Sequence, residues 1–184
     1  MTPQPVVDGT RGLGAVTADD VTVGEAAVLR FTGDAALQVQ RLAARAATAI
    51  ACDSLGLSEA MLAATVAYLQ VREQFGRPIG SFQAVKHACA DMLVRISVGR
   101  QLVRAAVDAV AEDRPDAALA ASKAKAYASD AAVEIAGKAM QLHGGIGYTW
   151  ESGVHVYLKR ATLNRALFGS PAAHRRRIAG QFRT

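Results

Sequence analysis

The feature that most constrains the fold is a long stretch free of helix-breaking residues, positions 34–75. It contains no proline and a single glycine, Gly56, and alanine recurs throughout it. Alanine has the highest helix propensity, and proline is the residue that most strongly ends a helix. The stretch is also far longer than an average helix of about 11–12 residues. The sequence therefore predicts one long helix, opened by Gly33 and Asp34, with a kink or break between residues 53 and 56.

A second helix is predicted from Ser81, which would cap it, to about Asp113. Apolar side chains recur there every three to four residues, with one longer gap around Gly99. This spacing directs one stripe of side chains toward a core, formed by Val85, Cys89, Met92, Ile96, Val103, Val107 and Val110.

Three more helices are expected. Pro115 suits the first turn of the third helix. Eleven alanines between Ala117 and Ala139 give that helix a face that its neighbours can approach closely. Shorter helices are expected at 151–167 and 172–182. Because the connections are short, neighbouring helices should run antiparallel.

The predicted fold is therefore all-α, an up-down helical bundle over residues 33–184, preceded by a short extended arm at residues 1–32. Positions 1–12 are rich in proline and glycine, which predicts a loop. Positions 13–29 carry β-branched valines around two adjacent aspartates at 19 and 20. This pattern predicts one or two short strands joined by a turn.

The chain carries a formal net charge of +5 and an isoelectric point of about 9.6. Its basic residues are spread along the sequence, apart from a cluster at 174–177, and aromatic residues do not alternate with them. This pattern does not favour nucleic-acid binding. It is typical of solvated helix faces, and it would also suit a polyanionic ligand such as coenzyme A or a flavin dinucleotide.

No run of eighteen apolar residues occurs, so no membrane span is expected. The first residues lack the basic and apolar segments of a signal peptide. Cys52 and Cys89 lie in predicted helices and are expected to be buried, reduced thiols of a cytoplasmic protein. His143 has no second ligand in register, so it is expected to pack in a loop and no metal site is predicted.

Two glycine-containing motifs lie where predicted helices end. Residues 69–83 read Leu-Gln-Val-Arg-Glu-Gln-Phe-Gly-Arg-Pro-Ile-Gly-Ser-Phe-Gln, and residues 141–150 read Gln-Leu-His-Gly-Gly-Ile-Gly-Tyr-Thr-Trp. Three glycines within four residues break a helix and let a ligand or another chain come close. Taken alone, such a segment could be a plain helix C-cap. Tyr148 and Trp150 are expected to pack against a helix.

Together, in this order and at this spacing, the two motifs resemble the acyl-CoA dehydrogenase family, as does the segment Ala90-Asp91-Met92. The resemblance covers about residues 8–180 and corresponds only to the C-terminal part of the family's usual chain. It implies that family's C-terminal helical domain, with residues 1–32 as the remnant of a middle β-domain.

The resemblance also implies an FAD site shared with a neighbouring subunit, because the family's helical domain contacts the ADP half of an FAD held mainly by another chain. By this resemblance the Arg72 guanidinium pairs with the pyrophosphate. The other contacts implied are with Gln74, Phe75, Gln83, Gln141 and the backbone of Gly144 and Gly145. The competing interpretations are that Arg72 is only a cation at a helix C-terminus and that Phe75 packs in the core.

The catalytic base of the family is missing from the sequence. Family members use a glutamate to remove a proton from the α-carbon of an acyl thioester while a hydride passes from the β-carbon to the flavin. The two family positions for this glutamate correspond here to Phe168 and Ala46. Neither side chain accepts a proton, so the chain alone is expected not to catalyse dehydrogenation.

Two hypotheses follow. In the first, the chain resembles the non-catalytic subunit of heteromeric bacterial family members and contributes to an FAD site for the α,β-dehydrogenation of acyl-CoA thioesters. Its partner would be a catalytic acyl-CoA dehydrogenase subunit or, in a homo-oligomer, a second copy of itself, and it would meet acyl-CoA only indirectly. In the alternative, the chain is a structural assembly module without cofactor contact.

Overall fold

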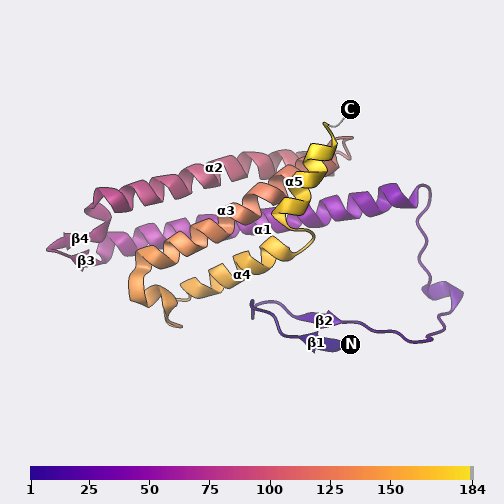
Figure 1. The fold of residues 1–184 in the computed structure, drawn as a ribbon, viewed down its shortest axis with the longest axis horizontal. Helices are drawn as coiled ribbons and strands as arrows, with labels where there is room; N and C mark the ends of the chain where they lie inside the picture. The colour runs from indigo at the N-terminus through magenta and orange to yellow at the C-terminus, as the bar shows by residue number, and fades with distance from the viewer. Residues whose placement is uncertain (183–184) are drawn as a thin grey trace.

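The computed structural model describes residues 1–182, and the predicted helical bundle is confirmed (Figure 1). Successive long helices reverse direction, so α1 and α3 run parallel to each other and antiparallel to α2 and α4. The short α5 crosses the end of the bundle at which α1 and α3 begin. The helices are α1 (Ala35–Val71), α2 (Gln83–Ala111), α3 (Ala117–His143), α4 (Val154–Ala166) and α5 (Pro171–Gly180).

α1 is a single continuous helix of 37 residues. It begins as predicted, because the Asp34 carboxylate accepts hydrogen bonds from the first free backbone N–H groups of the helix. The break predicted between residues 53 and 56 does not occur in α1. A glycine costs a helix about 1 kcal/mol, and the burial of Leu57 and Met61 directly after Gly56 outweighs that cost.

α1 ends earlier than predicted, at Val71 rather than near Phe75. The next residues form a tight two-strand turn, in which β3 (Glu73–Gln74) pairs with β4 (Arg77–Pro78). A short 3₁₀ turn, η2 (Ile79–Ser81), leads from β4 to α2. The pairing of β3 with β4 thus takes the place of the last predicted turn of the first helix.

α3 forms the centre of the bundle and packs against α1, α2, α4 and α5. Its alanines Ala124, Ala132, Ala136 and Ala139 have no exposed surface. These small side chains let the neighbouring helices approach α3 closely, as the sequence predicted. The main cluster includes Leu57, Met61, Met92, Ile96 and Ile135.

Several predicted helix starts are wrong by a few residues. Ser81 does not cap α2; its hydroxyl donates to the Pro78 carbonyl, 2.7 Å away, inside η2. Pro115 precedes α3 instead of lying in its first turn. The fourth helix begins at Val154, because Gly153 adopts a left-handed conformation at its start.

Val107, predicted to be in the core, is 41% exposed.

The N-terminal arm also differs from the prediction. It contains a hairpin in which β1 (Thr2–Gln4) pairs with β2 (Leu13–Ala15), so part of the predicted loop is a strand. Residues 16–32 contain one 3₁₀ turn, η1 (Glu25–Ala27), and no strand. The valines of this stretch favour strands only where a neighbouring strand pairs with them, and these valines are exposed.

The expected burial of the two cysteines needs correction. Cys52 is exposed and Cys89 is half-buried, so neither thiol is fully buried; partial burial raises the pKa of both. By length and composition alone, α1 is long and apolar enough to cross a membrane. Core helices of globular proteins pass the same test, and 39% of its most apolar window is buried in this bundle.

Candidate functional site

The two sequence motifs meet in one cavity of about 440 Å³, where α1 and α3 end. We call this cavity the polar hollow. It brings together Arg72, Gln74, Gln141, Gly144 and Gly145, five residues assigned to cofactor binding from the sequence. The remaining lining residues are Tyr68, Ile79, Leu142, His143 and Ile146.

Arg72 is placed by the turn that ends α1. Its backbone N–H donates to the Tyr68 carbonyl, and its carbonyl accepts from the N–H of Ile79, 2.8 Å away. This return of the chain needs Gly80, because a Cβ there would lie 2.9 Å from the Leu69 carbonyl oxygen. The Arg72 side chain is exposed and has no ion-pair or hydrogen-bond partner in residues 1–182. Its guanidinium is therefore free to bind an anion.

The glycines that end α3 serve two different purposes. Gly144 and Gly145 have open space where a Cβ would stand, so the hollow reaches their backbone. Gly147 is buried, and a Cβ there would lie 2.7 Å from the Met140 carbonyl oxygen. The first two keep the hollow open, whereas the third lets the 3₁₀ turn η3 (Gly144–Tyr148) fold back onto α3. The amide oxygen of Gln141 accepts a hydrogen bond from the Lys138 ammonium, 3.1 Å away.

His143 joins the two sides of the hollow. It is the last residue of α3 rather than a loop residue, and its ring stacks on that of Tyr68 with centroids 4.6 Å apart. Its Nδ1 lies 2.8 Å from the Ala139 carbonyl oxygen. Sequence reasoning assigned neither ring to the site. The available signal was the position of Tyr68, one helical turn before Arg72.

Two predicted cofactor residues lie outside the hollow. Phe75 is 89% exposed at φ +53°, and the one ring contact found for it among residues 1–182 is an edge-to-face contact with Phe82, at a centroid distance of 6.1 Å. It is therefore not a core residue, which excludes one competing interpretation. Gln83 is exposed at the first position of α2.

The aromatic residues after the glycines are also exposed. Tyr148 is 70% and Trp150 is 77% exposed. The prediction that both pack against a helix is wrong for Tyr148, for which no ring contact is found among residues 1–182. Trp150 contacts α4 through the ring of His155, at a centroid distance of 4.5 Å, and through the ammonium of Lys159.

The two positions at which the family resemblance predicts a catalytic base carry no proton acceptor. Ala46 is half-buried on α1, and Phe168 is 59% exposed at φ +55° in the turn between α4 and α5. That turn is held by buried Lys125, whose ammonium lies 3.0 Å from the Gly169 carbonyl oxygen, and by His174, whose Nε2 lies 3.1 Å from the Phe168 carbonyl oxygen.

Burial sets the ionisation of both supporting side chains. It lowers the pKa of Lys125 to about 8, opposed by the charge of Asp130. It also lowers the pKa of His174; the hydrogen bond to Phe168 opposes this, and the positive charges of Arg177 and Lys125 add to it. The turn therefore rests on two groups that are weaker bases than usual.

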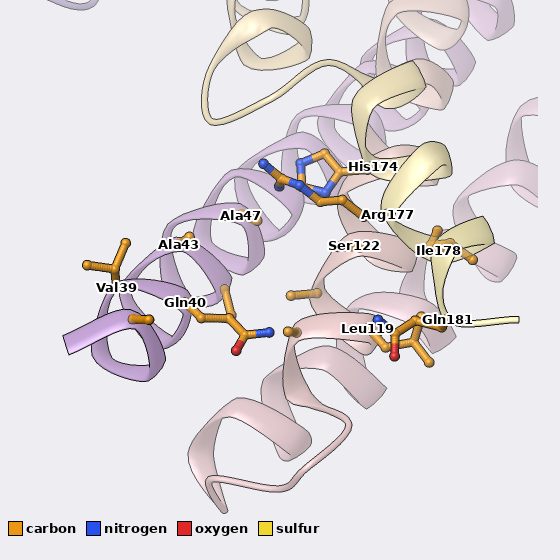
Figure 2. Close-up of a pocket in the computed structure, with 14 residues that line it drawn as sticks. Val39, Gln40, Ala43, Ala47, Leu119, Ser122, His174, Arg177, Ile178 and Gln181 are labelled. Carbon is orange, nitrogen blue, oxygen red and sulfur yellow. The ribbon is translucent and has the colours of Figure 1, made fainter. Parts of the chain in front are cut away.

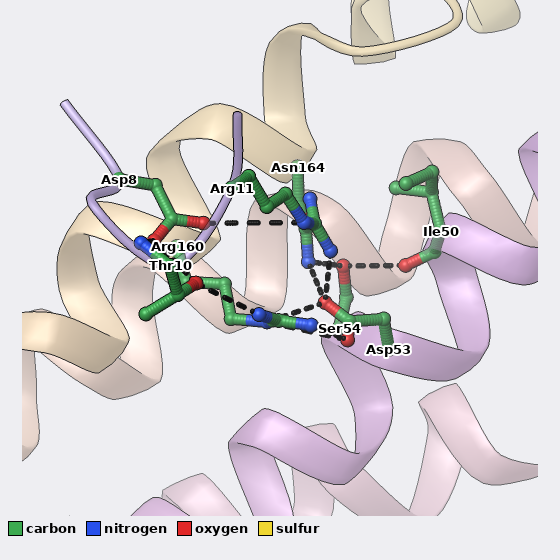
Figure 3. A network of polar contacts seen from close by, with 8 residues as sticks. All are labelled: Asp8, Thr10, Arg11, Ile50, Asp53, Ser54, Arg160 and Asn164. Atoms are coloured by element: carbon green, nitrogen blue, oxygen red, sulfur yellow. Dashed lines mark hydrogen bonds and ion pairs between the residues drawn. The ribbon is translucent and has the colours of Figure 1, made fainter. Parts of the chain in front are cut away.

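The carboxylate nearest to Ala46 along α1 belongs to Asp53, two helical turns away (Figure 3). Arg160 lies 2.6 Å from it, Asn164 2.6 Å and Arg11 3.0 Å. Burial alone would raise the Asp53 pKa, but hydrogen bonds from Arg160 and Asn164 and the charges of Arg160 and Arg11 lower it overall. Asp53 is therefore a poor base, and its network fastens the arm to α1 and α4.

No group of three histidine, cysteine, aspartate or glutamate side chains that could hold a metal ion occurs within residues 1–182. The geometry instead offers a free guanidinium, amide groups and open backbone around one cavity. These are donors suited to an anionic ligand with an extended polar framework.

Comparison with known proteins agrees with this geometry. Residues 36–182 match the family model for the C-terminal domain of acyl-CoA dehydrogenase. The acyl-CoA dehydrogenase IpdE2 of Mycolicibacterium smegmatis is 37% identical over 179 residues, which are 97% of this chain and 52% of that protein. The chain thus spans about half the length of this relative.

Solved structures show the same fold. An acyl-CoA dehydrogenase from Slackia heliotrinireducens superposes with a TM-score of 0.89 at 24% identity, over 98% of this chain and 48% of that chain. A variant of the Tcur3481-Tcur3483 steroid ACAD gives a TM-score of 0.69 at 36% identity, over 73% of this chain and 37% of that chain. The chain belongs to the acyl-CoA dehydrogenase family and carries that family's C-terminal domain.

Proposed function

We propose that this chain contributes the polar hollow to an FAD site that a second chain completes, in an assembly that dehydrogenates acyl-CoA thioesters. The observation that carries the proposal is the convergence of two separate motifs on one cavity with a free guanidinium. Neither a simple helix cap nor a surface cation requires the two motifs to meet.

The lining residues fit the cofactor. Arg72 would hold the pyrophosphate, because its planar donors match phosphate oxygens. Gln141 would donate its amide hydrogens, and the bare backbone at Gly144 and Gly145 leaves room where a side chain would clash. FAD supplies a hydride acceptor when bound. This chain would orient the phosphate end and leave the reacting carbons to its partner.

A catalytic partner follows from the base positions. Phe168 and Ala46 cannot remove a proton, and Asp53 is held in ion pairs. In this proposal a second chain would supply the base, and this chain would be the non-catalytic subunit. The joined name of the Tcur3481-Tcur3483 relative fits an assembly of two different chains. The other possible arrangement is an assembly of identical copies of this chain. We also propose that the protein is cytoplasmic.

The alternative is an assembly module that has lost cofactor contact. The exposed rings of Phe75, Tyr148 and Trp150 favour this alternative, because exposed aromatic residues are typical anchors of protein interfaces. Both functions predict a partner, but only the first predicts that the hollow retains flavin.

The test is to purify the tagged chain with its partner and measure the dissociation constant of FAD. A hydrogen bond to a charged group contributes about 1.5–3 kcal/mol. Arg72→Ala should therefore weaken FAD binding by about ten- to a hundredfold, and Arg72→Lys should weaken it less. Arg77→Ala is the matched control, because Arg77 lies in the same turn but outside the hollow.

An unchanged FAD constant in Arg72→Ala, with only a slightly lower melting temperature, would refute the cofactor role and leave the assembly module. The chain alone, supplied with FAD, is expected to turn over no acyl-CoA. Turnover by the isolated chain would show that it contains a base of its own.

A further inference from the structure

A second cavity, of about 450 Å³, lies where α1 and α3 begin, covered by α5 (Figure 2). We call it the apolar hollow. Its volume is within the range of about 300–1,000 Å³ that small-molecule pockets occupy. It lies far from the polar hollow: Ala47 and Tyr68, one from each cavity, are separated along α1 by roughly 30 Å.

The walls of the apolar hollow are mostly methyl groups. Alanines from α1 and α3 face each other across it, and α5 adds Ile178 (Figure 2). Because these side chains are short, the two helices and α5 leave space between them. The apolar lining is Ala36, Val39, Ala43, Ala44, Ala47, Ala118, Leu119, Ala121 and Ile178.

Among residues 1–182, the lining contains one cation and no carboxylate. Arg177 on α5 has no ion pair within the described part of the chain, whereas its neighbour Arg175 pairs with Asp130. Gln40 on α1 and Gln181 on α5 carry amide groups that can donate hydrogen bonds, and Ser122 adds a hydroxyl. A cation facing apolar walls without a counter-ion selects for an anion attached to an apolar body.

A buried polar atom lies beside that cation. His174 is 1% exposed and lies next to Arg177 at one end of the cavity (Figure 2). Since a carbonyl oxygen only accepts, the hydrogen bond to Phe168 requires Nε2 of His174 to carry a proton. In the neutral ring Nδ1 is then an acceptor, and it has no partner among residues 1–182. A buried acceptor without a partner destabilises the folded chain, so a ligand that supplies a donor there gains affinity.

We infer that the apolar hollow binds a small aliphatic carboxylic acid, with its chain against the alanines and its carboxyl group between Arg177 and His174. One oxygen accepts from the Arg177 guanidinium. Because the other carboxylate oxygen and Nδ1 of His174 are both acceptors, binding takes up one proton from solvent, and this proton lies between the two atoms and gives Nδ1 a partner. The inference is independent of the proposed FAD role, because the two cavities have no lining residue in common.

The test uses the full chain and three ligands with the same eight-carbon chain: octanoate, 1-octanol and octylamine. Calorimetry should detect saturable binding of octanoate, and octanoate should raise the melting temperature, because a ligand that binds only the folded state stabilises it. The alcohol and the amine should bind at least about ten times more weakly, since neither carries a negative charge that pairs with the Arg177 guanidinium.

Two variants test the location of the ligand. Arg177→Gln removes the charge and should weaken octanoate binding by about tenfold or more. Ala43→Leu fills the cavity from an exposed position, so it should abolish binding while the chain stays folded. Arg176→Gln is the matched control, because Arg176 is the adjacent exposed cation outside the lining, and it should bind octanoate like the wild type.

Far-UV circular dichroism would establish that each variant is folded. The inference is overturned if octanoate shows no saturable binding at millimolar concentration. It is equally overturned if 1-octanol binds as well as octanoate, or if folded Arg177→Gln and Ala43→Leu both bind like the wild type.

Discussion

The polar and apolar hollows have nearly the same volume, about 440 and 450 Å³, and lie at opposite ends of the α1–α3 pair. Their linings differ in kind. The polar hollow is built where both helices stop, from glycines, turn backbone and long polar side chains. The apolar hollow is built along the helices, from alanine methyl groups beneath a short crossing helix.

This difference shows two ways in which a helical bundle makes a cavity. A helix end exposes backbone groups and allows abrupt turns, so it suits polar ligands. Along a helix face the backbone N–H and C=O groups are hydrogen-bonded to one another, so only side chains reach a ligand. A cavity forms there where those side chains are small. The first kind depends on local sequence, whereas the second depends on which faces meet.

The largest effect is expected at Gly147, beneath the polar hollow. Gly147→Ala places a Cβ 2.7 Å from the Met140 carbonyl oxygen, and backbone cannot move aside as a flexible side chain can. Overpacking of this kind costs about 1–3 kcal/mol, and we expect the upper end. Chemical denaturation would measure the loss of unfolding free energy.

Gly145→Ala is the matched control within the same turn. Its Cβ meets no atom within 4 Å, so stability should change little. FAD retention in the purified complex should nevertheless fall, because the new methyl group would occupy ligand space. If the two variants were equally destabilised, the assignment of different purposes to these glycines would be wrong.

The next largest effect concerns Lys125, which holds the turn into α5 and thereby one wall of the apolar hollow. Its pKa is about 8 in the folded chain against 10.5 ordinarily. Between these two pH values the unfolded chain binds more protons, so stability should rise with pH from about 8 to 10.5. A pKa that differs by one between the folded and unfolded chain corresponds to about 1.4 kcal/mol of stability. We expect the unfolding free energy to rise by about 2 kcal/mol in total. This is less than the whole pKa difference would correspond to, because solvent near the turn screens part of the interaction.

Unfolding free energies measured across this alkaline range would check the rise. Lys125→Met should remove it, whereas Lys123→Met, at an exposed position two residues earlier, should retain it. A rise that persists in Lys125→Met would mean that another group is responsible.

The smallest effect is expected at Asp53, which lies on α1 between the two hollows. Its folded pKa is lowered from the ordinary 3.8. The stability it contributes is therefore complete above about pH 4 and is lost as the pH falls through its folded pKa. At neutral pH, Asp53→Asn should cost about 1 kcal/mol, because the ion pairs are only partly buried.

Asp19→Asn, on the exposed part of the arm, is the control and should leave stability at neutral pH unchanged. If Asp53→Asn matched the wild type at neutral and acid pH, the network would not fasten the arm.

The polar hollow was largely predictable because its residues follow two helix ends. The rules that end a helix act over a few residues, so the two glycine-containing turns could be located in advance. The family resemblance of the two motifs then singled out Arg72, Gln141, Gly144 and Gly145 within them. The positions of Phe75 and Gln83 were not predictable in the same way. They depend on how the β3–β4 turn leaves α1, and strand pairing replaced the predicted last helical turn there.

Other features are contacts between residues that lie far apart in the sequence, which rules acting over a few residues do not predict. The stacking of His143 on Tyr68 depends on the register of α3 against α1. The Asp53 network joins α1, α4 and the arm. The unbroken course of α1 through Gly56 was also decided by burial on both sides of the glycine, against its local propensity.

The sequence by itself determined the helical composition of the bundle, the alanine face of α3, the residue types at Phe168 and Ala46, neither of which accepts a proton, and the donors at the two helix ends. These are properties of residue type and of neighbours within a few positions. The tertiary structure alone decided that the donors share one cavity, that Lys125 and His174 support the Phe168 turn, and that α5 closes an apolar hollow over alanines. Each of these depends on the relative placement of whole helices, which the summed packing of many side chains fixes and no short segment encodes.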